Sequence, residues 1–316
     1  MLSRRRARAA AVAAGLALLA GLTMSLSGCS TSFAFGLGDP GGRIFAVGAE
    51  SEYANVIQQV GGEYVQVSAI LSNPNTDPHA FEASAAVGRL LNQAQLVVQN
   101  GAGYDTFMNT IEGAVPGSSR KLIAVQDLLG LPDSTPNPHL WYRPGTMPAV
   151  ADAIAADLAA IQPAHAAYFK ARAAAFDRSL ETWTNAVAQF KAGYQGTPVA
   201  TTEPVADYLL QALGARNLTP WAFQADIMNG TDPSPQDVAA EQNLLTQHKV
   251  KALVYNQQVT DSLTESFISL AKANGIPVVG VYETMPESGY DYQSWMLAEV
   301  QALRNAITSH TSTEHL

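Results

Sequence analysis

Short apolar runs alternate with longer amphipathic stretches in the first part of the chain. The apolar runs cover residues 44–47, 64–71 and 96–99, and the stretches 53–60 and 84–94 between them have helical periodicity. The second run alternates apolar and polar residues until an Asn-Pro-Asn turn, and the serine at 84 is placed to cap the following helix. Strands separated by helices are typical of a parallel α/β sheet.

The middle of the chain carries two long stripes of apolar residues at spacings of three and four. The first runs from Met147 to Ile161, and the second runs from Phe169 to Phe190, after Pro163. Both predict amphipathic helices. At 1.5 Å per residue the second helix is about 40 Å long, which is enough to run the length of a two-lobed molecule. Glycines at 193 and 196 predict its end.

The second half of the chain resumes the alternation of strands and helices. Predicted strands cover 198–201, 252–255 and 278–282, and predicted helices cover 205–213, 262–273 and 292–307. The fold class that follows is α/β, with two small parallel-sheet lobes joined by one long helix.

The first residues have the composition of an export signal. Four arginines lie within residues 4–8, and an apolar run from Ala9 to about Leu22 follows them. This run is short for a membrane span, which needs about 20 apolar residues. It is followed by Leu26-Ser27-Gly28-Cys29, which resembles a lipobox. The resemblance implies cleavage before Cys29, the only cysteine, and lipid attachment to it. An uncleaved anchor helix and an ordinary signal peptide are the alternatives.

These patterns divide the chain into five predicted segments. They are a lipoprotein signal peptide (1–28), a flexible linker rich in glycine and small polar residues (29–42), an N-terminal α/β lobe (43–162), a long connecting helix (163–195) and a C-terminal α/β lobe (196–316).

The charge of the chain limits its partners. There are 18 basic and 27 acidic residues, for a net charge of −9, and loss of the arginine-rich leader makes the mature protein more acidic. Such a surface repels phosphate backbones, so we expect no nucleic-acid partner.

Two histidines lie in nearly the same local sequence. His79 follows Asp77-Pro78, and His139 follows Asn137-Pro138, each in a loop and each near an aromatic residue. Proline restricts its own backbone and that of the residue before it, so each imidazole is held on a stiffened turn. This would preorganise a ligand, although two polar loop histidines are the simpler interpretation.

Two carboxylates in the second half also lie at predicted strand ends. Glu203 follows the strand at 198–201, and Glu283 follows the strand at 278–282. Ligands of open parallel sheets bind outside the carboxyl ends of the strands, so His79, His139, Glu203 and Glu283 can meet in a cleft between the lobes. A helix N-terminal acid at Glu203 and a solvated loop acid at Glu283 are the alternatives. Glu287 and Asp291 are rival fourth ligands.

Two imidazoles and two carboxylates form a mixed nitrogen and oxygen site. Such a set suits a divalent transition metal, Zn²⁺, Mn²⁺ or Fe²⁺. It is too rich in nitrogen for Ca²⁺ or Mg²⁺. Ligand identity does not separate Zn²⁺ from Mn²⁺.

From residue 43 onward the chain resembles the metal-receptor lipoproteins of zinc and manganese ABC uptake systems, in the helical-backbone metal-receptor superfamily. The resemblance is carried by Asp77-Pro78-His79-Ala80-Phe81-Glu82, Asn137-Pro138-His139-Leu140-Trp141, Thr202-Glu203-Pro204 and the loop around Glu283. It implies that His79, His139, Glu203 and Glu283 bind one transported ion. It also implies a monomer, lipid-anchored to the cell membrane on the extracytoplasmic side, that delivers the ion to an ABC permease and is not an enzyme.

The chain departs from this family in two respects. Zinc receptors commonly carry a histidine-rich loop between the first two ligands and a histidine as third ligand, whereas no histidine lies between His79 and His139 and the third ligand is Glu203. Manganese receptors usually have aspartate where Glu283 stands. The metal is therefore left open between Zn²⁺ and Mn²⁺.

Other histidines and other functions have weaker support. We expect His165 to be solvated, His248 to lie near a helix end, and His310 and His315 to lie in a frayed tail. Asn100-Gly101 could support a ligand, but a plain turn is favoured. An extracellular metallohydrolase would need an open metal position and a general base, and the sequence has no His-Glu-x-x-His motif. A surface adhesin is a third hypothesis, without a recognisable docking surface.

Overall fold

The computed structural model describes residues 42–316, except for residues 76, 115–118 and 287–288. The predicted signal peptide and Cys29 therefore lie outside the described residues. Within the described part of the chain, no helix is both long enough and apolar enough to cross a bilayer.

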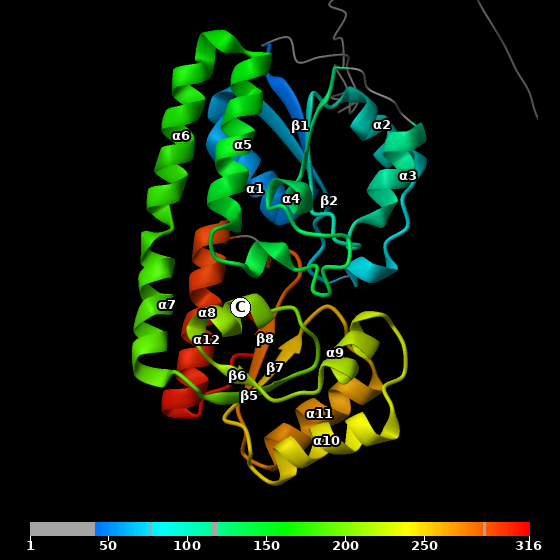
Figure 1. The fold of residues 1–316 in the computed structure, drawn as a ribbon, viewed down its shortest axis with the longest axis vertical. Helices are drawn as coiled ribbons and strands as arrows, with labels where there is room; N and C mark the ends of the chain where they lie inside the picture. The colour runs from blue at the N-terminus through cyan, green and yellow to red at the C-terminus, as the bar shows by residue number, and fades with distance from the viewer. Residues whose placement is uncertain (1–41, 76, 115–118, 287–288) are drawn as a thin grey trace, which may run out of the picture. The chain divides into compact units, whose positions relative to one another are not determined.

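The first four strands form a parallel sheet in the order β2-β1-β3-β4, of which Figure 1 labels β1 and β2. Strand β1 (Ile44–Glu50) lies between β2 (Val65–Leu71) and β3 (Leu96–Gln99), and β4 (Lys121–Ala124) forms the edge. The helices of this N-terminal lobe are α1 (Ser51–Gly61), α2 (Ala85–Gln93), α3 (Thr106–Ala114), α4 (Val125–Leu128) and α5 (Thr146–Ile161). Short 3₁₀ turns lie at Gly62–Tyr64 (η1), Pro78–Ala80 (η2) and Leu140–Tyr142 (η3).

The last four strands form a second parallel sheet with the equivalent order, β6-β5-β7-β8. Its strands are β5 (Pro198–Thr201), β6 (Arg216–Asn217), β7 (Leu253–Asn256) and β8 (Val278–Val281). Its helices are α8 (Asp207–Leu213), α9 (Trp221–Met228), α10 (Pro235–Thr246), α11 (Ser262–Ala273) and α12 (Tyr292–Ser309). In each sheet the strand order reverses beside the first strand, which is where open α/β sheets bind ligands at their carboxyl ends.

Polar side chains begin several of these helices, as the sequence predicts for Ser84. The Ser84 hydroxyl accepts a hydrogen bond from the Ala86 amide at the start of α2, and Ser234 caps α10 in the same way. Asp261 and Asp291 form capping boxes at α11 and α12. These bonds satisfy amides that have no partner within a helix.

The predicted connecting helix is interrupted. After a 3₁₀ turn at Pro163–His165 (η4), the structure has α6 (Ala166–Ser179) and α7 (Glu181–Tyr194), separated by Leu180. The Ser179 hydroxyl donates to the Phe176 carbonyl at 2.6 Å, and the Leu180 amide bonds the Asp177 carbonyl in a tighter turn. A serine that bonds back to the preceding turn competes with the helical pattern and bends a helix.

The apolar stripe nevertheless continues across this break into one core. Phe169, Phe176 and Trp183 are buried, and the Trp183 ring packs edge-on against Tyr292 with centroids 6.0 Å apart. Helix α6 lies against α1 and α5, and α7 lies against α8 and α12 (Figure 1). The two helices therefore join the cores of both lobes.

The C-terminal tail is not frayed, contrary to expectation. The Thr313 amide donates to the Val278 carbonyl at 3.0 Å, and the Gly280 amide donates to the Thr313 carbonyl at 2.8 Å. Lys272 forms an ion pair with Glu314 at 2.9 Å. The tail pairs with the otherwise open edge of β8, so its backbone groups find partners there.

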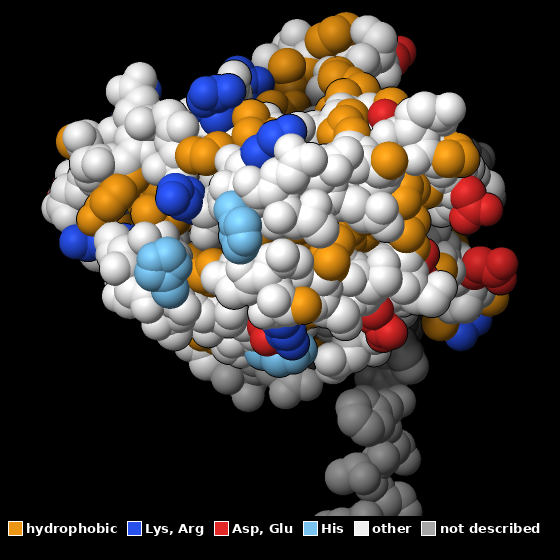
Figure 2. Space-filling model, turned by 90° about the horizontal axis from the view of Figure 1, so that it is seen from below, with side chains coloured by type: hydrophobic (Ala, Val, Ile, Leu, Met, Phe, Trp, Pro, Cys, Tyr) orange, Lys and Arg blue, Asp and Glu red, His pale blue; other side chains and the backbone are white. Residues whose placement is uncertain are grey.

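The end of the molecule that carries α10 and α11 is visible in Figure 2. On this face basic, acidic and apolar side chains all occur, with histidines among them. This mixture is typical of a solvated protein surface.

Candidate metal centre

His79 lies on the turn η2, which follows β2. The Asp77 carboxylate accepts a hydrogen bond from the His79 amide at 2.8 Å, and Pro78 occupies the first position of the turn. An aspartate that bonds the amide two residues on, with a proline between them, makes a rigid turn. The His79 side chain is 25% exposed, and its ring packs edge-on against Tyr104.

His139 is held by the same device and is fully buried. The Asn137 Oδ1 accepts from the His139 amide at 3.0 Å and also lies 2.8 Å from Nδ1 of the His139 ring. Since Oδ1 is an acceptor, Nδ1 carries the proton and the Nε2 lone pair is left available as a ligand. The two Asx-Pro-His motifs thus work in the same way: the side chain of the first residue accepts a hydrogen bond from the histidine amide and fixes the turn that holds the histidine.

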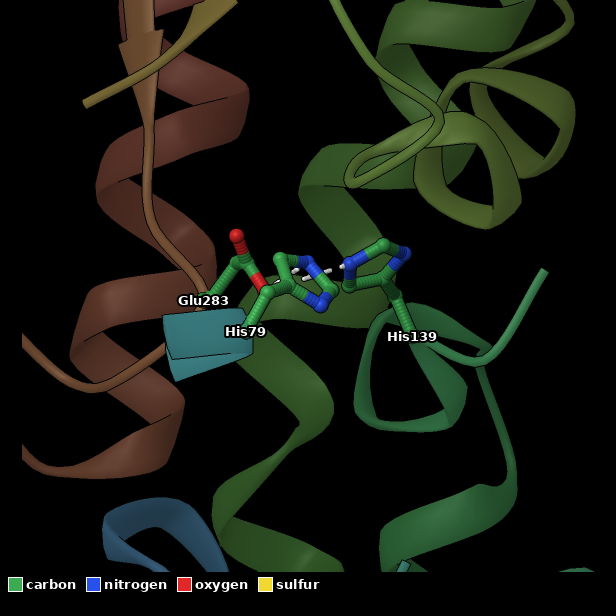
Figure 3. A group of neighbouring side chains, drawn as sticks. All are labelled: His79, His139 and Glu283. Atoms are coloured by element: carbon green, nitrogen blue, oxygen red, sulfur yellow. Dashed lines mark ion pairs between the residues drawn. The ribbon is translucent and has the colours of Figure 1, made fainter. Parts of the chain in front are cut away.

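Glu283 follows β8 and meets both histidines (Figure 3). Its Oε2 lies 3.2 Å from Nε2 of His79 and 3.4 Å from Nε2 of His139. One ligand atom from each of the three residues lies within 4.8 Å of the others. Glu283 is fully buried, so residues from both lobes converge on one buried point.

Glu203 lies beside this group without being one of the three that converge. It follows β5 and is 3% exposed, and its Oε1 accepts from Asn256 Nδ2 at 3.3 Å. The same Nδ2 donates to Glu283 Oε1 at 2.5 Å. Glu203 Oε2 is buried with no hydrogen-bond partner among the described residues. A buried carboxylate oxygen without a partner is costly unless a cation or proton meets it.

The rival fourth ligands differ in their placement. Asp291 is exposed, and its carboxylate accepts from the Ser294 amide as the N-cap of α12, which gives it a structural role. Glu287 lies outside the described residues.

The electrostatics of the site favour a positive charge. Burial alone would raise the pKa of Glu283, but the neighbouring His139 and His79 rings outweigh burial and hold that pKa below its usual range. Burial opposes protonation of His79, yet Glu283 raises the pKa of His79 to about 9. Burial lowers the pKa of His139, and burial together with Glu283 raises the pKa of Glu203. Without a cation, the site therefore attracts protons to His79 and Glu203.

Residues that the sequence did not single out complete the site. The Tyr104 hydroxyl donates to Glu283 Oε2 at 2.9 Å, and the Glu283 amide donates to Gln258 Oε1 at 2.7 Å. Asn256 is the last residue of the buried strand β7, and this position at a carboxyl end was the available signal. Tyr104 had no comparable signal, because it lies in an irregular loop.

Asn100 holds the loop that carries His139, so the favoured interpretation as a plain turn was wrong. It is fully buried, and its Nδ2 donates to the Pro138 carbonyl at 2.8 Å, next to His139. Its Oδ1 accepts from the Tyr53 hydroxyl at 2.7 Å. His165, which was expected to be solvated, is half-buried and stacks on Tyr64 with centroids 3.8 Å apart.

A cavity of about 350 Å³ opens beside His79. Its walls come from the His79 turn with Asp77 in the N-terminal lobe and, in the C-terminal lobe, from the end of α9 at Met228, the two residues after it, and Val259, which follows β7. His79 is the exposed member of the group of three, so the cavity opens this side of the group to solvent.

Over most of its length the chain is similar to known metal-binding proteins. Residues 47–306 match the model of the family ZnuA, zinc-uptake complex component A, periplasmic. The chain is 22% identical over 266 residues to the manganese-binding lipoprotein MntA of Bacillus subtilis, covering 80% of this chain and 83% of MntA. It is 21% identical over 270 residues to the zinc-binding lipoprotein AdcA of Streptococcus pneumoniae, covering 78% of this chain but only 52% of AdcA. The chain thus matches about half the length of AdcA.

Solved structures share the fold. The periplasmic zinc-binding protein TroA of Treponema pallidum superposes with a TM-score of 0.71 at 18% identity, covering 84% of this chain and 99% of TroA. The solute-binding protein FpvC of Pseudomonas aeruginosa, in complex with Ni²⁺, superposes with a TM-score of 0.69 at 20% identity, covering 87% of this chain and 100% of FpvC. The α/β fold with two parallel-sheet lobes is therefore confirmed.

The family match covers most of the chain and confirms the resemblance seen in the sequence. Its members are metal-binding solute receptors rather than enzymes, which confirms the prediction of a non-enzymatic protein. The chain belongs to the ZnuA family of zinc-uptake complex components.

Proposed function

We propose that this protein captures one divalent transition-metal ion, Zn²⁺ or Mn²⁺, between its lobes and delivers it to an ABC permease. The ligands are His79, His139, Glu203 and Glu283. The observation that carries the proposal is the approach of His79, His139 and Glu283 from two lobes to within 4.8 Å of one another at a buried point. The unpartnered Oε2 of Glu203 supplies the fourth donor.

The donor set accounts for the choice of ion. Two imidazoles and two carboxylates suit borderline dications and supply the two negative charges that a buried dication needs. Ligand capture replaces the proton-dependent contacts between Glu283 and the imidazoles, so binding is expected to release protons.

Calorimetric titration of chelator-stripped protein with Zn²⁺ or Mn²⁺ tests the proposal. The wild type should bind one ion per chain, and His79→Ala and His139→Ala should each abolish stoichiometric binding. His165→Ala is the matched control, because His165 stacks on Tyr64 outside the site. Stoichiometric binding that survives both ligand substitutions would reject the assignment. Asp291→Asn should leave binding intact, whereas Glu203→Gln should weaken it.

We further propose that cleavage before Cys29 and lipid attachment anchor a monomeric receptor on the extracytoplasmic side of the membrane, and that the five predicted segments are its organisation. Detergent partitioning of the cell-expressed protein tests the anchor. Wild type should enter the detergent phase and Cys29→Ser should stay in the aqueous phase. Equal partitioning of both would contradict the lipid anchor.

A further inference from the structure

The two carboxylates of the C-terminal lobe share one hydrogen-bond donor. Asn256 ends β7, between Glu203 after β5 and Glu283 after β8, and all three are buried. Its Nδ2 lies 3.3 Å from Glu203 Oε1 and 2.5 Å from Glu283 Oε1. An amide nitrogen carries two hydrogens, so it can donate one to each carboxylate.

The orientation of the Asn256 amide is determined by its other contacts. Its Oδ1 accepts from the Gln258 amide at 3.0 Å, so Nδ2 must be the atom that faces the carboxylates. The Asn256 backbone amide donates to Thr202 Oγ1 at 3.1 Å, next to Glu203 in the chain. A flipped side chain would place its oxygen against two carboxylates and break the bond to Gln258. Asn256 is thus a fixed donor within one lobe.

Because of this donor, the two oxygens of each carboxylate have different partners. In both residues Oε1 faces Asn256, which leaves Oε2 for other partners. Glu283 Oε2 is the oxygen that faces the two imidazole nitrogens (Figure 3), and Glu203 Oε2 has no partner. With each Oε1 held toward Asn256, each carboxylate presents its Oε2 to an ion, and on Glu283 this oxygen also accepts from the Tyr104 hydroxyl at 2.9 Å.

We infer that Asn256 is a specificity-determining residue that limits both carboxylates to one metal contact each and thereby favours Zn²⁺ over Mn²⁺. This inference rests on the proposed function. Two imidazole nitrogens and two single oxygens make four donors, the number that Zn²⁺ adopts in proteins. Mn²⁺ prefers more oxygen-rich, six-coordinate surroundings, which two-oxygen binding by Glu203 and Glu283 would provide.

Asn256→Leu removes the donor while keeping a similar side-chain volume. Both Oε1 atoms then become available, so the ratio of Zn²⁺ affinity to Mn²⁺ affinity should fall by about tenfold or more, the effect of one additional contact of ordinary strength. Competition titrations with the two ions measure this ratio. Bound Co²⁺ gives a second readout, because four-coordinate Co²⁺ absorbs visible light much more strongly than six-coordinate Co²⁺. The variant should show weaker bands than the wild type.

Asn217→Leu is the matched control. Its amide also donates to a carboxylate of the same lobe, that of Asp207 at 2.9 Å, but it touches neither Glu203 nor Glu283. This variant should keep the wild-type affinity ratio and Co²⁺ spectrum even if its stability falls. If Asn256→Leu does not fold, Asn256→Ala serves instead, since it removes the donor without placing a third carboxyl group beside Glu203 and Glu283.

The outcomes separate the two hypotheses. Failure of the wild type to bind any dication stoichiometrically would overturn the proposed function itself. Stoichiometric binding with an affinity ratio and Co²⁺ spectrum unchanged in the Asn256 variant would overturn only the role of Asn256. A lower ratio together with weaker Co²⁺ bands, both absent from Asn217→Leu, would support it.

Discussion

The hydrogen bonds of Asn100 predict that helix α1 and the loop carrying His139 stabilise each other. Asn100 links Tyr53 on α1 to the Pro138 carbonyl in the loop that carries His139. In Asn100→Ala the buried Tyr53 hydroxyl loses its partner, which costs about 1–3 kcal/mol. The Pro138 carbonyl keeps a bond from the Leu140 amide at 2.7 Å, so its loss is smaller, about 1 kcal/mol. The total destabilisation is therefore about 2–4 kcal/mol.

A double-mutant cycle separates this bond from general packing effects. Tyr53→Phe alone leaves Asn100 Oδ1 without its partner, whereas the double variant leaves neither group unpaired. The double variant should consequently be less destabilised than the sum of the single variants, by about 1–2 kcal/mol. Urea unfolding of the metal-stripped proteins gives the three differences in the free energy of unfolding. Additivity within about 0.5 kcal/mol would refute a direct Asn100–Tyr53 bond.

Three further predictions concern other contacts. Burial raises the pKa of Glu241 to about 8, so the folded state holds a proton that the unfolded state releases near pH 4.5. The protonated Glu241 therefore makes its full contribution to the free energy of unfolding below pH 4.5. That contribution is lost as the pH rises to about 8, by up to about 1.4 kcal/mol per pH unit. Glu241→Gln should flatten the fall in urea midpoint between pH 5 and 8, and an unchanged slope would contradict this. The Tyr142 hydroxyl lies 2.7 Å from Glu299 and 2.8 Å from the Tyr282 carbonyl, so Tyr142→Phe should lower the free energy of unfolding by about 1–3 kcal/mol, and a loss below about 0.5 kcal/mol in urea unfolding would argue against the bond. Truncation after His310 removes the pairing of Thr313 with β8 and should lower the melting temperature by several degrees. The control Glu314→Gln removes only an exposed ion pair and should shift the melting temperature little. Equal shifts in scanning calorimetry would contradict a structural role for the pairing.

Local patterns predicted most of the fold because periodicity and capping act over a few residues. The strands 96–99 and 198–201 and the helix 262–273 have the predicted bounds. Helix α9 and strand β4 were not predicted. Strand β4 is short, and Leu122 within it is 45% exposed, so its identity as a strand comes from pairing with β3 rather than from its own pattern. The break at Leu180 was missed because the apolar stripe runs through it unchanged.

Part of the candidate site was predictable from local sequence, and part was not. His79 and His139 could be recognised from the sequence because the Asx-Pro turn that holds each of them is local. The position of Asn256 at a strand end was visible in the sequence, but its contact with two carboxylates was not, since β5, β7 and β8 bring Glu203 and Glu283 to its sides only in the fold.

The sequence by itself determined the α/β character of the lobes, the apolar stripe between them and the identity of the main polar groups at the strand ends, because these depend on neighbours within a turn or a strand. The tertiary structure decided which of those groups meet. His79, His139 and Glu283 come together, Glu203 joins them through Asn256, and Asp291 is used to cap a helix. The physical reason is that strand order and lobe packing set distances between residues far apart in the chain, and no local pattern encodes them.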